Sequence, residues 1–126
     1  MYDLQKNKNF LKTLISYTKD GKIIWDYLDA EPLDQDVIDK IEYLLPIDYD
    51  VIDFENSFYY ADKQSNTYAL VRTLSSNYYF FLIPYTLKST QSLCDNEYTQ
   101  LIVELSNIIQ SKLPSAQQMI DNILNM

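Results

Sequence analysis

The sequence predicts an α+β fold in which helices pack on a small antiparallel sheet. Apolar residues recur at helical spacing near both ends of the chain, three strand-like runs lie between them, and the loops joining those runs are short. Short loops favour antiparallel hairpins, because parallel strands need long crossover connections. A length of 126 residues is typical of one domain, so we expect residues 1–126 to form a single α+β domain.

The first element is expected to be a helix near the N-terminus. Phe10, Leu11 and Leu14 fall on one face at helical spacing, and the only glycine of the chain, Gly21, follows them. Glycine readily adopts the left-handed conformation that ends many helices. The side chains of the next residues, 23–28, follow an alternating pattern. This pattern predicts a short extended segment, with a helical turn as the alternative.

A second helix is predicted between two prolines, Pro32 and Pro46. Proline is tolerated in the first turn of a helix and cannot continue the last one. The residues between them, 33–45, carry a clean apolar stripe. The opposite side of this helix carries three carboxylates: Asp36, Asp39 and Glu42. We therefore expect a helix with an acidic outer face.

The three strand-like runs are residues 51–61, 67–74 and 78–83, joined by polar turns at 62–66 and 75–77. The third run is apolar on both sides, as in a strand that is covered on both faces. This pattern predicts a small three-stranded sheet. The extended segment that follows the first helix is an optional fourth strand, placed beside the third run.

Two more helices are expected after the sheet. Residues 98–109 show the helical pattern, with Asp95 or Asn96 as the cap. Pro114 then interrupts the chain, and 115–124 begin with a Ser-x-x-Gln capping box and complete a short last helix. The predicted architecture has two N-terminal and two C-terminal helices, packed on one face of the sheet.

The composition argues against an enzyme. With no histidine and one glycine, the chain has no imidazole base and no glycine-rich phosphate loop. The one cysteine, Cys94, precedes Asp95, whose charge opposes a thiolate, so we treat it as structural. We expect no catalytic residues and no cofactor.

A metal site is also not expected. Residues 48–55 hold four acids, and calcium prefers oxygen ligands. An EF-hand loop that began at Asp48 would need ligands where Ile52 and Tyr59 stand. The spacing therefore fails.

The distribution of charge is the most informative feature. The chain has 18 acids and 10 bases, but residues 26–62 hold twelve acids and one base, Lys40. Residues 1–25 hold two acids and five bases, and residues 63–126 hold four of each. Like charges that are concentrated in this way repel one another and attract a basic surface. The alternative is a solvated face that only keeps the protein in solution.

The leading hypothesis is therefore a non-enzymatic, acidic protein-binding module of inhibitor or immunity type, a nucleic-acid mimic that docks onto a basic protein partner. Tyrosine is enriched at interfaces, which makes the two tyrosines of the acidic segment candidate anchors. The alternatives are a small acidic chaperone or adaptor and, less favoured, a carboxylate-based ligand-binding protein. The predicted partner-binding residues are Asp34, Asp36, Asp39, Glu42, Tyr43, Asp48, Tyr49, Asp50, Asp53 and Glu55.

Several short stretches resemble known proteins: residues 10–25, which read Phe-Leu-x-x-Leu and end in Thr-Lys-Asp-Gly-Lys-Ile-x-Trp, then Asn-Ser-Phe-Tyr at 56–59, and the run at 78–84. They resemble uncharacterised short proteins of Gram-positive bacteria and their mobile elements. The resemblance implies a bacterial or phage accessory protein and no particular activity.

The expected location is the cytoplasm. A single cysteine cannot form an internal disulfide, and the N-terminal residues lack the order of a signal peptide. The net charge of −8 disfavours direct binding to nucleic acid or to an anionic membrane. The sequence leaves monomer and homodimer open.

Overall fold

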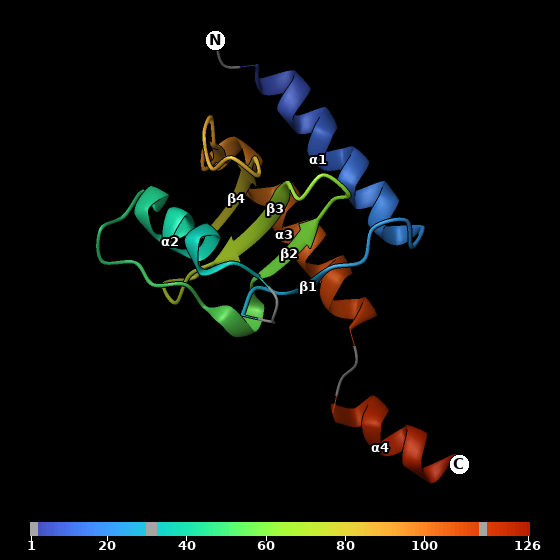
Figure 1. Cartoon of the computed structure of the whole chain (residues 1–126). Coiled ribbons are helices and arrows are strands. Elements are labelled where there is room, and N and C mark those ends of the chain that lie inside the picture. The colour runs from blue at the N-terminus through green and yellow to red at the C-terminus, as the bar shows by residue number, and fades with distance from the viewer. Residues whose placement is uncertain (1–2, 30–32, 114–115) are drawn as a thin grey trace.

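The computed structural model describes residues 3–29, 33–113 and 116–126, and its core has three layers (Figure 1). The middle layer is a five-stranded antiparallel sheet in the order β1-β2-β3-β4-β5. The strands are β1 (Asp26–Tyr27), β2 (Phe58–Ala61), β3 (Thr67–Arg72), β4 (Tyr78–Ile83) and β5 (Gln91–Leu93). The helices are α1 (Leu4–Lys19), α2 (Gln35–Leu44), the 3-10 turn η1 (Phe54–Asn56), α3 (Asn96–Lys112) and α4 (Ala116–Leu124).

Helices α1 and α3 cover one face of the sheet. Leu11 of α1 and Leu105 of α3 are fully buried and belong to the same core cluster as Phe80 of β4. Trp25 joins this cluster, where its indole N–H donates to the hydroxyl of Thr18 at 3.0 Å. Burying the apolar stripes of both helices against one sheet face supplies the main part of the core.

Helix α2 covers the opposite face. Its Val37 and Ile41 pack in a second core cluster with Val71 of β3 and Phe81 of β4. Neighbouring residues of β4, such as Phe80 and Phe81, therefore enter different clusters, because side chains alternate across a strand. This explains why the run at 78–83 is apolar on both sides.

The prediction of a three-stranded sheet with two N-terminal and two C-terminal helices packed on one face is wrong. The sheet has five strands, and three helices cover it, two on one face and one on the other. The extended segment after α1 pairs with β2, not with β4: Asp26 lies opposite Tyr59. β5 takes the place beside β4, with Leu93 opposite Phe80. Strands of two or three residues are too short to show a period of two, so the sequence pattern missed them.

The predicted end of the first helix is confirmed, but the second helix begins later than predicted, at Gln35. α1 is followed by Gly21 at φ 76°, in the left-handed region, as expected. α2 ends at Leu44, before Pro46, and its N-cap is Asp34; Pro32 lies outside the described residues. The N-cap of α3 is Asp95.

The expected strand at 51–61 is interrupted. Ile52 forms an isolated bridge with Thr73, and the chain then turns through η1 before β2 begins at Phe58. Arg72 and Ser57 hold this interruption together, because the Ser57 hydroxyl donates to the Arg72 carbonyl and accepts from its N–H. The residue that follows η1 is thereby fixed to the end of β3.

Helix α4 projects away from the layered core (Figure 1). All its described side chains from Gln117 onward are exposed, including Ile123 at 68% and Leu124 at 75%. The predicted capping residue of this helix, Ser115, lies outside the described residues, as does Pro114. Among the described helices, none has the length and apolar character needed to span a bilayer.

Candidate functional site

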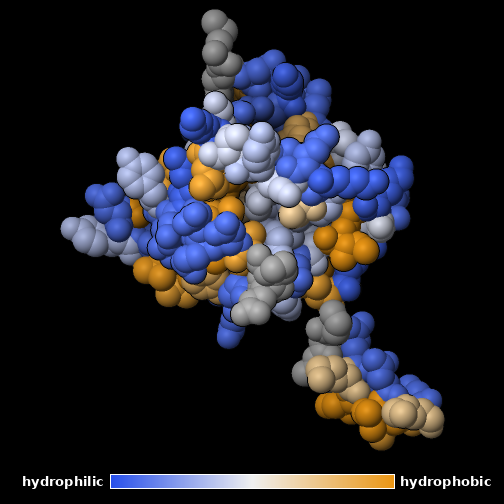
Figure 2. Space-filling model, viewed as in Figure 1, coloured by the Kyte–Doolittle hydropathy of each residue, from blue (hydrophilic) through white to orange (hydrophobic). Residues whose placement is uncertain are grey.

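The outer face of α2 is acidic because its apolar and acidic residues keep separate helical positions. Val37, Ile38 and Ile41 point into the core, and the residues between them stay exposed. Hydrophilic side chains gather over this helix (Figure 2). We call five exposed residues the α2 acidic surface: Asp34, Asp36, Asp39, Glu42 and Tyr43.

No described base neutralises the carboxylates of the α2 acidic surface by an ion pair. The lysines of α1 lie in the opposite layer, across the sheet (Figure 1). Lys40, on α2 itself, holds its ammonium 5.9 Å from the centre of the Tyr43 ring. Tyr43 is 82% exposed, and Tyr49, in the loop that follows the helix, is 95% exposed.

The loop acids of the predicted site divide into two groups. Asp48 and Glu55 are exposed, whereas Asp50 and Asp53 are half-buried and serve the fold. Asp50 accepts hydrogen bonds from Ser75 and Asn77. Burial raises the pKa of Asp50, but these hydrogen bonds outweigh burial and lower the pKa below its ordinary value.

Asp53 is also committed to the fold. Its carboxylate pairs with the guanidinium of Arg72 and accepts from the side-chain amide of Asn56 at 2.9 Å. Its side chain is only 12% exposed. The free carboxylates that the structure brings together are therefore those of α2, and Asp50 and Asp53 anchor the loop beside them.

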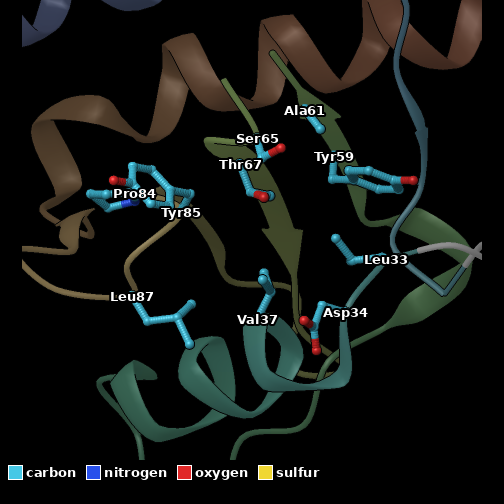
Figure 3. A pocket seen from close by; sticks show the side chains of 10 residues that line it. All are labelled: Leu33, Asp34, Val37, Tyr59, Ala61, Ser65, Thr67, Pro84, Tyr85 and Leu87. Atoms are coloured by element: carbon cyan, nitrogen blue, oxygen red, sulfur yellow. The ribbon is translucent and has the colours of Figure 1, made fainter. Parts of the chain in front are cut away.

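A cavity of about 340 Å³ lies between the N-terminal half of α2 and the sheet (Figure 3). Its described walls come from α2, from β2 and β3 with their connecting turn, and from the loop after β4. Ten described residues line it: Leu33, Asp34, Val37, Tyr59, Ala61, Ser65, Thr67, Pro84, Tyr85 and Leu87. Most of this described lining is apolar, and Asp34 is the one charged residue among these ten.

The hydroxyl of Thr67 is the polar group that stands out in the cavity. Thr67 is 5% exposed as a residue, but no described side chain leaves a buried polar atom without a partner, so the Thr67 hydroxyl oxygen is reached from the cavity that it lines. It projects toward the space between α2 and the sheet (Figure 3). A hydroxyl in a cavity wall can donate a hydrogen bond to a bound group or accept one from it.

Two backbone features shape the same cavity. Ser65, in the turn between β2 and β3, and Leu87, in the loop after β4, adopt φ values of 64° and 62°. Residues other than glycine rarely occupy this region. Tyr59 closes another wall, and burial, together with the nearby charge of Asp26, raises the pKa of its hydroxyl.

Sequence reasoning did not find this cavity. Val37 and Leu33 were assigned to the core stripe of the helix, and Thr67 and Ser65 carry no motif. Asp34 was predicted as an acidic contact residue, and the structure places it both on the α2 acidic surface and in the cavity wall.

The described residues contain no cluster of three or more metal-ligating side chains. Burial raises the pKa of the Cys94 thiol, which disfavours the thiolate form. Comparison of the chain with protein-family models, curated proteins and solved structures found no match.

Proposed function

We propose that this chain is a non-enzymatic protein-binding module that docks its α2 acidic surface onto a basic surface of another protein. The observation that supports this most strongly is a helix face whose carboxylates are exposed and lack a described ion-pair partner. Repulsion among them is relieved when a cationic surface covers them.

The mode of action that follows is occupancy. Dense charge of one sign speeds association with a complementary surface, and exposed aromatic side chains supply the contact area that holds the complex. Tyr43 and Tyr49 provide that area beside the carboxylates. A surface that normally binds nucleic-acid phosphates has the complementary charge, so the module acts as an inhibitor of such a protein.

Reversing three carboxylates of α2 tests the proposal. The variant Asp36→Lys/Asp39→Lys/Glu42→Lys should associate with the basic partner at least about tenfold more slowly, and its on-rate should lose most of its dependence on salt. The partner is first captured from the native host with the wild-type chain at low salt. Association rates are then measured with the purified partner by surface plasmon resonance.

A matched control separates a local surface from net charge. The variant Glu97→Lys/Glu104→Lys/Asp121→Lys changes the charge by the same amount on exposed residues of α3 and α4. It should keep most of the wild-type on-rate. Equal slowing in both variants would show that overall charge governs binding, and the docking site would then not be α2. Circular dichroism confirms that both variants fold.

Helix α4 favours a second candidate, a small adaptor that holds an apolar client. Met119, Ile120, Ile123 and Leu124 are more than half exposed, and the apolar side chains lie along one side of the helix (Figure 2). Exposed apolar stripes of this kind commonly mark binding sites. An amphipathic helix can lay such a stripe into a groove of another protein.

Replacing Ile120 and Ile123 by serine tests the adaptor candidate. The wild-type chain should bind an apolar dye and the Ile120→Ser/Ile123→Ser variant should lose most of that fluorescence, with no change in unfolding because both side chains are exposed. Light scattering reports the mass of both. Equal dye binding by the two chains would exclude α4 as the client site.

A further inference from the structure

We propose that the cavity beneath the N-terminal half of α2 receives a lysine or arginine side chain of the basic partner. This inference rests on the proposed function and adds the anchor point of the complex. Its basis is a hollow that opens beside the α2 acidic surface and whose described walls are mainly apolar, with one carboxylate, that of Asp34, and the hydroxyl of Thr67.

The size of the cavity suits a side chain and not a large cofactor. Its volume of about 340 Å³ lies near the lower end of the range of roughly 300–1,000 Å³ that is typical of small-molecule sites. A long basic side chain has a flexible aliphatic stem that packs well on apolar surface while its charged head keeps polar contacts. Leu33, Val37 and Leu87 offer that apolar surface.

The charges around the cavity select a cation. Asp34 is the only charged residue among its described lining. Burial, followed by the negative charge of Asp26, raises the pKa of Tyr59 in the cavity wall. The N-terminus of α2 contributes about half a positive charge, which Asp34 and Asp36 together outweigh. An anionic ligand would meet repulsion from both carboxylates.

The hydrogen-bonding groups also fit a cationic head. One carboxylate oxygen of Asp34 accepts from the N–H of Asp36 at 2.9 Å, which leaves its second oxygen available. An ammonium or guanidinium group brings only donors and needs several acceptors. The hydroxyl oxygen of Thr67, in the wall of the same cavity, provides a second acceptor.

The position of Asp34 links the cavity to the docking surface. Asp34 caps α2, lies on the exposed acidic face and lines the cavity. A partner that covers the carboxylates of α2 therefore has a basic side chain within reach of the opening. Charged groups that are held in a preformed pocket act as anchors more effectively than those on an open rim.

Titration with n-butylammonium, a mimic of the lysine side chain, tests the inference. Two-dimensional NMR of the labelled full chain should show saturable shifts of the Val37, Thr67 and Leu87 amides, with a dissociation constant in the millimolar range. Butyrate at the same ionic strength should leave these signals in place. Shifts with butyrate as large as those with the amine, or none with either, would overturn the inference.

Two matched variants show whether the charge inside the cavity matters. Asparagine caps helices as well as aspartate does, so Asp34→Asn preserves α2 and removes the charge. It should weaken n-butylammonium binding at least about fivefold. Asp36→Asn removes an exposed charge from the same turn and should change binding less than about twofold. Equal losses in the two variants would show that the amine follows the general field and not the cavity.

A third variant tests the role of the Thr67 hydroxyl. Thr67→Val keeps the shape of the side chain and removes its oxygen, so n-butylammonium should bind about threefold more weakly. Circular dichroism confirms that the variant folds, and wild-type affinity in a folded variant would remove Thr67 from the site.

The two proposals fail in different ways. If the cavity does not bind the amine while reversal of the α2 carboxylates slows association, the docking function stands and this inference falls. If the amine binds but the reversed variant associates normally, docking through α2 falls, and with it the claim that the cavity serves a partner.

Discussion

Replacing Phe80 with alanine should lower the free energy of unfolding by about 3–5 kcal/mol. Phe80 is fully buried in β4, which pairs with β3 on one side and β5 on the other. Its ring packs edge-on against those of Phe10 of α1 and Trp25, with ring centroids 5.9 Å and 6.2 Å apart, respectively. The space left by the ring is walled by the sheet and two helices, so the neighbours can close it only in part.

Urea unfolding of the wild-type chain and the variant measures this loss. Small domains are stable by only about 5–15 kcal/mol, so the expected change is a large fraction of the total. Tyr43→Ala, at an aromatic residue that is 82% exposed, is the control and should change stability by less than about 0.5 kcal/mol. A loss below about 1 kcal/mol for Phe80→Ala would contradict its place at the centre of the core.

The helices were predictable because each carries a long apolar stripe. The stripes of α1, α2 and α3 each span several turns, and such a pattern is specific to a helix of that length. The layer that each helix joins was not predictable. Both faces of β4 are apolar, which shows that the strand is covered twice but does not say by which helix.

The sequence did not predict the short strands, for a different reason. β1 has two residues and β5 has three, and their pairing depends on neighbours far along the chain. The alternating side-chain pattern of residues 51–61 also predicted a continuous strand wrongly. The alternation continues through η1, where the backbone turns. Tertiary contacts such as those of Ser57 with the Arg72 backbone override local propensity there.

The candidate site also has a part that the sequence predicts and a part that it does not. The exposure of Asp36, Asp39 and Glu42 follows from helical spacing alone, so the sequence predicts it correctly. The structural roles of Asp50 and Asp53 do not follow, because their partners lie up to 27 residues away in sequence. The cavity is similarly hidden, since its walls come from segments that only the folded chain brings together.

Replacing Arg72 with alanine is expected to cost about 2–3 kcal/mol of stability, the second large effect. Its guanidinium pairs with Asp53, donates to the Ser76 hydroxyl at 3.0 Å and lies over the ring of Tyr78. Removing the cation leaves the carboxylate of Asp53, whose side chain is 12% exposed in the wild-type chain, without its counter-charge. The loss is smaller than for a fully buried pair, because the Arg72 side chain is 26% exposed and water screens it.

A double-mutant cycle isolates the contribution of the pair. Asp53→Asn removes the charge and keeps an oxygen that accepts from Asn56. In Arg72→Ala/Asp53→Asn, no unpaired carboxylate is left, so the double variant should be more stable than the sum of the single losses predicts, by about 1–2 kcal/mol. Strict additivity in urea unfolding would show that the two side chains act independently.

The same variants also bear on the docking surface. Asp53 and Arg72 hold the loop that follows α2, whereas the carboxylates of the helix are exposed and make no described ion pair. If partners are steered by α2, Arg72→Ala should keep the wild-type on-rate below its unfolding transition, even though it loses stability. Fold and recognition would then depend on different members of one acidic segment, which is why its net charge alone does not identify the contact residues.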